Sequence, residues 1–126
     1  MTITEFLLAR IAEREEAARA ASHAGPRWKT PTVHGPIVAI DNDTEWGGDP
    51  VVYDEGSPSE DQAAHIALND PAHVLAECEA KRRIVARHEV GDDCGYWDVS
   101  NCPDMRDLAS VFADHPGFQD EWRSVG

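Results

Sequence analysis

The sequence predicts an α+β fold: an N-terminal helix, a small antiparallel sheet of two or three strands, then two to four C-terminal helices. Apolar residues recur at helical spacing near the start and again after residue 71. Between them, short β-branched and aromatic runs alternate with turn residues over residues 28–53. A chain of 126 residues with 41% hydrophobic and 28% charged residues is predicted to form a single domain, 1–126.

The first helix is expected over about residues 2–22. Thr2 followed by Glu5 fits a capping box, in which each side chain accepts a hydrogen bond from the other residue's backbone N–H. Gly25-Pro26 is expected to end the helix. Its apolar face is predicted to comprise Ile3, Phe6, Leu7, Ile11, Ala17, Ala18 and Ala21.

The strands are expected to be short or at sheet edges, because Pro31, Pro36 and Pro50 cannot donate to a ladder. Ser57 or Ser59 is expected to cap a helix over residues 60–68. Asp70 as N-cap and Pro71 as first residue predict a longer helix over 71–89. A last helix is expected over 103–114, followed by a helical turn at 118–122.

Acidic charge is concentrated in the middle of the chain. Residues 30–80 contain eleven Asp or Glu and no Lys or Arg, whereas the whole chain carries −13. This field disfavours nucleic acid and anionic lipid, so neither nucleic acid nor membrane is expected as a partner. It favours a basic protein surface, a cation, or no role beyond solubility. We therefore expect a non-enzymatic interaction protein, with these partner-binding candidates: Asp41, Asp43, Glu45, Trp46, Asp49, Asp54 and Glu55.

The spacing Asp41-x-Asp43-x-Glu45 resembles the start of a calcium loop. That loop needs Gly at its sixth position and Glu at its twelfth, where this chain has Trp46 and Val52. A solvated hairpin turn is the favoured interpretation.

The alternative function is a small zinc-binding module built on loop 88–102. His88, Cys94 and Cys102 bracket this loop and carry zinc-ligand chemistry. A fourth ligand is not evident, although His115, Asp92 and Asp93 are candidates. The other interpretations are a buried free Cys102 with an exposed Cys94, or a disulfide between Cys94 and Cys102. No other cofactor is expected.

Catalysis is not favoured. His65 and His73 flank the Asn69-Asp70-Pro71 junction, so a metal-dependent hydrolase is a third hypothesis, but no nucleophile or second carboxylate stands at diagnostic spacing. Cys78 falls on the apolar face of its helix and is expected to be a core residue. No glycine-rich phosphate loop is evident.

Two segments carry a family resemblance. They run over residues 62–85, including Asn69-Asp70-Pro71, and over 113–123, including His115-Pro116-Gly117. Both resemble an uncharacterised family, a domain of unknown function, of small acidic proteins from actinomycetes and their phages. Some relatives carry further Cys before the step that is Cys102-Pro103 here. The resemblance implies no activity, and a phage origin would favour a host-directed binding role.

A cytoplasmic location is expected. Glu5, Glu13, Glu15 and Glu16 interrupt the stretch where a secretory signal would be apolar. Three cysteines fit a reducing compartment better than a disulfide scaffold. The sequence does not indicate an oligomeric state.

Overall fold

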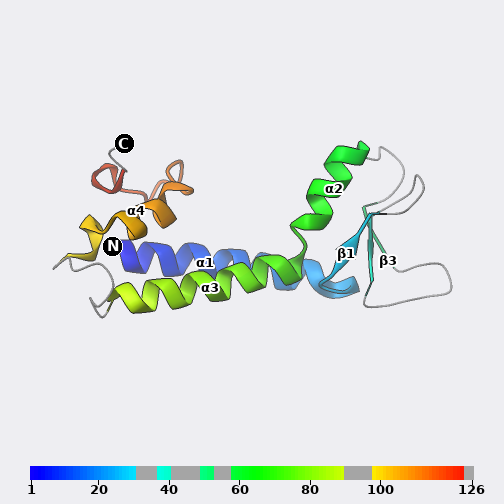
Figure 1. Ribbon diagram of the computed structural model, residues 1–126, viewed down its shortest axis with the longest axis horizontal. Coiled ribbons are helices and arrows are strands. Elements are labelled where there is room, and N and C mark those ends of the chain that lie inside the picture. Colours follow the sequence, from blue (N-terminus) through cyan, green and yellow to red (C-terminus); the bar gives the residue numbers. More distant parts are fainter. Residues whose placement is uncertain (31–36, 41–48, 53–57, 90–97, 124–126) are drawn as a thin grey trace. The chain divides into compact units, whose positions relative to one another are not determined.

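The computed structural model confirms the α+β fold. It describes residues 1–30, 37–40, 49–52, 58–89 and 98–123. Helix α1 (Ile3–Ala21) is followed by a three-stranded antiparallel sheet and by three further helices (Figure 1). These helices are α2 (Glu60–Leu68), α3 (Pro71–Glu89) and α4 (Pro103–Ser110). Within the described part, short 3₁₀ turns also occur at η1 (Ser22–Ala24), η2 (Val99–Asn101) and η3 (Asp120–Trp122).

The chain divides into two compact units, and its two long helices each contribute to both. Unit 1 comprises residues 1–13 and 78–126, and unit 2 comprises residues 14–77. The boundary at residues 13 and 14 lies within α1, and that at 77 and 78 lies within α3.

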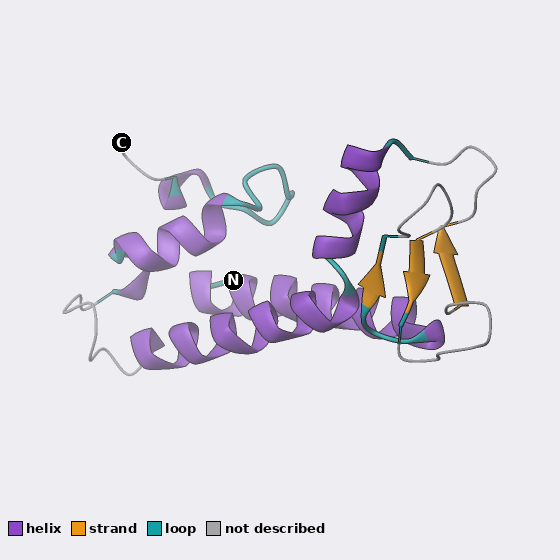
Figure 2. Cartoon of the chain, turned by 45° about the vertical axis from the view of Figure 1, so that its right-hand side comes forward, coloured by secondary structure: helices purple, strands orange, loops and turns teal. Residues whose placement is uncertain are grey.

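Unit 2 contains the sheet, with strand order β1 (Trp28–Lys29), β2 (Ile37–Ala39), β3 (Asp49–Val52). Trp28 pairs with Ala39, and Ile37 pairs with Val52 across the other edge of β2. The register shifts between Ile37 and Val38, which brings Pro50 opposite Val38. Pro50 therefore occupies an edge strand beside an irregularity, as expected for a residue without an N–H. The three strands lie side by side in Figure 2, and all three residues of the central strand β2 are buried.

Two helix starts in unit 2 have the predicted caps. Ser59 accepts from the backbone N–H of Gln62, whose side chain accepts from Ser59 N–H, which completes a capping box for α2. Asp70 Oδ1 accepts from His73 N–H at 2.8 Å at the start of α3. Its Oδ2 accepts from the backbone N–H of Trp28 at 3.1 Å, so one carboxylate both caps α3 and holds the first strand.

Unit 1 is organised around Phe6 on α1. Its ring meets Trp122 at a centroid distance of 5.1 Å and His115 at 5.5 Å, and it also contacts Phe112 and Phe118 edge-on. The C-terminal turns are thereby packed on the first helix. Thr2 and Glu5 form the predicted reciprocal cap at its N-terminus. The buried residues of this unit are Ile3, Phe6, Leu7, Ile11, Cys78, Val85, Cys102, Met105, Ala109 and Trp122, with Thr4 and His88 as buried polar residues.

The last α-helix ends earlier than expected. The sequence predicts a helix to residue 114, but α4 ends at Ser110. Beyond it, Phe112 N–H donates to Ala109 and His115 N–H donates to Phe112, so the chain tightens into three-residue turns. These turns place His115 against Phe6.

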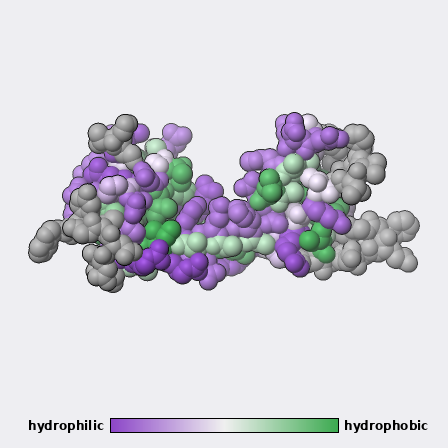
Figure 3. Space-filling view, in the orientation of Figure 1, coloured by the Kyte–Doolittle hydropathy of each residue, from purple (hydrophilic) through white to green (hydrophobic). Residues whose placement is uncertain are grey.

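No helix among the described residues is both long and apolar enough to cross a bilayer. Figure 3 shows a mainly hydrophilic face with separate groups of hydrophobic residues. The exposed large hydrophobic residues of the described part are Met1, Leu68 and Val111.

Candidate metal centre

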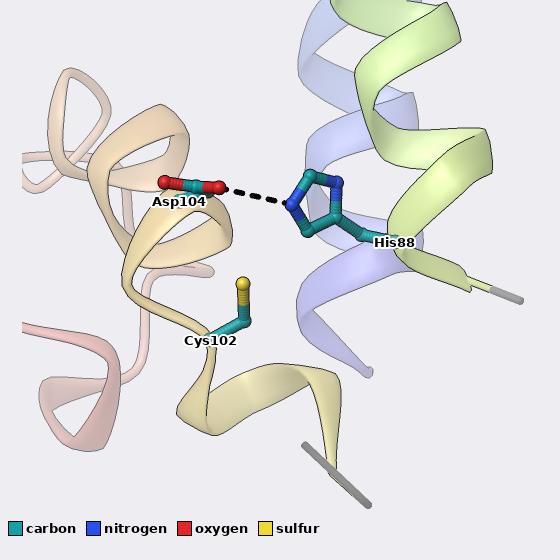
Figure 4. A group of neighbouring side chains, drawn as sticks. All are labelled: His88, Cys102 and Asp104. Carbon is teal, nitrogen blue, oxygen red and sulfur yellow. Dashed lines mark hydrogen bonds and ion pairs between the residues drawn. The ribbon is translucent and has the colours of Figure 1, made fainter. Parts of the chain in front are cut away.

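Three side chains with metal-ligand chemistry meet where the end of α3 faces the start of α4. His88, Cys102 and Asp104 each offer one ligand atom, and these atoms all lie within 4.8 Å of one another. Figure 4 shows the imidazole of His88 directed at the carboxylate of Asp104, with the Cys102 sulfur pointing toward the space beside them.

The local sequence explains how Cys102 is positioned at the start of α4. Pro103 is the first residue of α4, so Cys102 must remain extended, and it does so at φ −69° and ψ 123°. Arg106 of α4 then donates from Nε to the carbonyl of Ser100 at 2.6 Å and from a terminal nitrogen to Asn101 at 3.1 Å. These bonds hold η2 against α4 and thereby position Cys102.

Asp98 stabilises the same segment from its other end. Its carboxylate accepts from Ser100 N–H at 2.9 Å as the N-cap of η2. Hydrogen bonds from the side chain and backbone of Ser100 lower the pKa of Asp98 below its ordinary value. The cap is therefore ionised near neutral pH.

The hydrogen bonds of His88 define its chemistry. Its Nδ1 lies 2.7 Å from the carbonyl oxygen of Ile84, and its Nε2 lies 3.1 Å from Asp104 Oδ2. A carbonyl oxygen and a carboxylate oxygen can only accept, so Nδ1 must carry a proton. With Nδ1 protonated, an Nε2 that faces a carboxylate fits either a second proton, which makes an imidazolium, or another positive centre such as a metal ion.

Burial differs sharply across the site. The His88 side chain is 4% exposed, whereas that of Asp104 is 66% exposed. Cys102 is fully buried. The site thus has a buried imidazole and sulfur on one side and a solvated carboxylate on the other.

A groove of about 500 Å³ adjoins the site between α3 and α4. His88 and Asp104 belong to its lining, together with three apolar residues, two cations and one further acid. Those other lining residues are Ile84, Leu108, Val111, Lys81, Arg87 and Asp107.

Cys102 is disulfide-bonded, whereas Cys78 is a buried thiol outside any disulfide. A sulfur in a disulfide has no thiolate charge to offer a metal. The structure therefore represents the oxidised form of this site, and metal ligation by Cys102 requires the reduced form.

The structure joins some of the predicted site residues and separates others. His88 and Cys102 come together, while Cys94, Asp92 and Asp93 lie outside the described residues. His115 lies elsewhere: its Nδ1 accepts from Gly117 N–H at 2.9 Å and contacts Arg10 at the same distance. It is therefore not among the ligand atoms grouped with His88.

The acidic residues predicted to bind a partner fall mainly outside the described part of the structure. Asp41, Asp43, Glu45, Trp46, Asp54 and Glu55 lie outside the described residues, and Asp49 is placed only by its backbone in β3. His65 and His73 are exposed, and His73 pairs with Glu77 at 2.8 Å. Cys78 is buried, as its position on the helix predicts.

Asp104 is the site residue that the sequence interpretation missed. It lies 16 residues after His88, and the local sequence indicates only an acid that stabilises the first turn of a helix. Its proximity to Cys102, two residues earlier in the chain, was the available signal.

The match to a family model covers residues 1–124, and the model describes a family of unknown function, DUF6221. The chain belongs to this family. No curated protein and no solved structure matches it. Membership of DUF6221 agrees with the predicted resemblance to an uncharacterised family and brings no activity with it.

Proposed function

We propose that the reduced chain is a small zinc-binding module whose ligands are His88, Cys102 and Asp104. The observation that carries this proposal is the pairing of His88, whose two ring nitrogens both face acceptors. A zinc ion on Nε2 would replace the second proton and relieve the need for a buried imidazolium. The Ile84 carbonyl would remain as the partner that orients the ring.

The donor set and spacing suit zinc. Imidazole nitrogen, thiolate sulfur and carboxylate oxygen bind zinc at about 2.0–2.3 Å in a tetrahedron, which separates ligand atoms by about 3.3–3.8 Å. The three candidate atoms lie within 4.8 Å of one another, so closing on an ion needs movements of about 1 Å. Asp104 is exposed and can supply that movement through its side-chain rotamer.

The competing explanation is a metal-free ion pair between α3 and α4. In it, His88 is an imidazolium paired with Asp104, and Cys102 stays in its disulfide. The two explanations differ in whether His88 Nε2 carries a metal ion or a proton, and in the oxidation state of Cys102.

Metal analysis of the full chain, purified without added metal and kept reduced with a phosphine, distinguishes them. We expect stoichiometric zinc and, after exchange, a cobalt(II) spectrum with a thiolate charge-transfer band. His88→Gln and Cys102→Ser should abolish both. His73→Gln is the matched control, because His73 lies on the same helix but is exposed and outside the site. Absence of zinc and of the cobalt band in the reduced chain would rule out the proposal.

Cys94, the other cysteine of the predicted zinc-binding loop, is tested by a variant of its own. Cys94→Ser should leave the cobalt band in place if His88, Cys102 and Asp104 form the site. Loss of the band in Cys94→Ser would instead return the ligand set to the one that the sequence predicted.

A second candidate function is supported by the charge distribution. The segment 30–80 has eleven acids without one Lys or Arg, which favours a basic protein surface, including one that normally binds nucleic acid. In the described part, Glu60 and Asp61 are exposed at the start of α2. A phage-encoded, host-directed inhibitor acting in the cytoplasm is one form of this candidate.

Lysine replacement tests the acidic candidate. Changing Asp41, Asp43, Asp49, Asp54 and Glu55 to Lys should weaken capture of basic proteins, as should added salt. An equal number of replacements outside the segment, at Glu13, Glu16, Asp114, Asp120 and Glu121, is the control. Capture that survives both salt and the first set would refute electrostatic recognition.

A further inference from the structure

We propose that His115 is a pH-sensitive contact, which holds the C-terminal turns on α1 only while its imidazole is neutral. The turns concerned are residues 111–118, and they pack against Phe6 of α1. All of these residues belong to unit 1, and His115 is not among the ligand atoms grouped with His88. The contact is therefore independent of the proposed zinc site.

The hydrogen bonds of His115 require an unprotonated ring nitrogen. Its Nδ1 accepts from the backbone N–H of Gly117 at 2.9 Å. Arg10 Nη1 lies 2.9 Å from the same nitrogen and also adjoins Nε2. A backbone N–H and a guanidinium can only donate, so both neighbours need an acceptor. A neutral imidazole has one acceptor nitrogen and an imidazolium has none, so protonation removes the acceptor that both neighbours share.

The charge of Arg10 acts in the same direction. Its side chain is only 11% exposed, and its guanidinium carbon lies 5.2 Å from the centroid of the Phe6 ring. Its Nε is buried and has no hydrogen-bond partner in the described part of the chain. Glu13 pairs with Arg10 at 2.7 Å and thereby offsets this single positive charge. A second positive charge on His115 would be repelled by Arg10 across a poorly solvated contact.

The other charged groups of these turns do not compensate an imidazolium. Asp114 precedes His115 and is exposed, and the described contacts of the ring do not include its carboxylate. In η3, Asp120 pairs with Arg123 at 3.1 Å, and Arg123 lies over the ring of Phe118. The neutral form of the ring is therefore the one that fits against α1.

Protonation of His115 would loosen the turns from the first helix. The imidazole meets the Phe6 ring at 5.5 Å, and Phe6 also contacts Phe118 and Trp122. Phe118 N–H donates to the carbonyl of His115 at 2.9 Å, so a displacement of His115 is transmitted to Phe118. The loosened state binds one proton more than the packed state, so linkage favours it as the pH falls. Because Phe6 and Trp122 are buried, acid would uncover apolar surface in unit 1.

Amide hydrogen exchange of the full chain at about pH 7.5 and about pH 5 tests this contact. These values bracket about 6.5, where an ordinary histidine titrates, and stay above about 4, where ordinary carboxylates do. We expect the protection factors of Phe118 and Trp122, which correct for the intrinsic pH dependence of exchange, to fall about tenfold at the lower pH. Ala63 of unit 2 donates to Ser59 and should keep its protection.

His115→Asn isolates the effect of the proton. The side-chain oxygen of Asn stands at the position of Nδ1, so it can accept from Gly117 and Arg10 but does not titrate. We expect this variant to keep the turns protected at both pH values. His73→Asn is the matched control, because His73 is exposed and belongs to unit 2, and it should leave the pH response unchanged.

Arg10→Met decides the question if His115→Asn fails to hold the turns even at about pH 7.5. It removes the repelling charge and keeps the bond from Gly117, so the fall in protection should shrink to about threefold. An equal fall in the Arg10→Met variant and the unchanged chain would overturn the proposal. So would protection that is independent of pH, a fall of full size in His115→Asn, or a fall that includes Ala63 and is therefore global.

Discussion

The Nε2 atom of His88 and the Oδ2 atom of Asp104 lie 3.1 Å apart and join the last turn of α3 to the first turn of α4. The histidine is buried and the aspartate is solvated, so the pair lies at the boundary between the core of unit 1 and water. Any change to Asp104 therefore acts on a buried partner.

Removing the charge of Asp104 should destabilise the metal-free chain. Asp104→Asn replaces a carboxylate acceptor of the His88 ring by a neutral amide, and we expect a loss of about 1–2 kcal/mol in the free energy of unfolding. Asp107→Asn is the control on the same helix and should change stability by less than about 0.5 kcal/mol. Urea denaturation with chelator present measures both, and equal effects would contradict the pairing.

Asp70 should contribute more to the free energy of unfolding than an ordinary helix cap does. Asp70→Ala leaves the N–H groups of both His73 and Trp28 without their carboxylate acceptor, and we expect a cost of about 2 kcal/mol. Ser59→Ala removes a cap from α2 alone and should cost about 1 kcal/mol. Denaturation curves that rank Ser59→Ala as the more damaging variant would argue against the double role.

The N-terminus of α1 should be sensitive to acid. The pKa of Glu5 lies below its ordinary value of 4.5, first because of the backbone hydrogen bond from Thr2 and then because of the Thr2 side chain. A lowered folded pKa means that this stabilisation is present above the unfolded pKa and is lost as pH falls through the folded pKa. The protection factors of the amides at residues 3–5, which correct for the intrinsic pH dependence of exchange, should therefore fall on acidification below pH 4.5, and Glu5→Gln should remove that response.

Replacing Phe6 should strongly destabilise unit 1. Four rings surround it, so Phe6→Ala opens a cavity, and we expect a loss of about 3–5 kcal/mol. Phe118→Ala should cost less, because Phe118 is only half-buried. Circular dichroism during urea titration checks the order, and a greater loss for Phe118→Ala would show that the packing centre lies elsewhere.

Local sequence spacing was sufficient for most of the fold. The reciprocal cap of Thr2 and Glu5, the cap of Ser59 and the Asp70-Pro71 start are decided within three or four residues. Helices α2 and α3 accordingly have the predicted bounds. The end of α4 depends instead on how the turns after Ser110 pack His115 on Phe6, which no local pattern encodes.

The candidate site was only half predictable. His88 and Cys102 were recognisable by their side-chain chemistry. Asp104 joins them because α4 packs beside the end of α3, and that contact is tertiary. His115 has the same chemistry as His88, but its ring is held by Gly117 N–H and packed on Phe6. Residue type alone could not distinguish these two histidines.

The division of the chain has a consequence for its biosynthesis. Unit 2 is one continuous stretch, 14–77, so all its residues are available before residues 78–126 have been synthesised. Unit 1 combines residues 1–13 with residues 78–126, so Phe6 can meet Trp122 only after the whole of unit 2 has been made. Until then the apolar side chains of the unit 1 part of α1 lack their C-terminal partners, and they are exposed to aggregation and proteolysis during that interval.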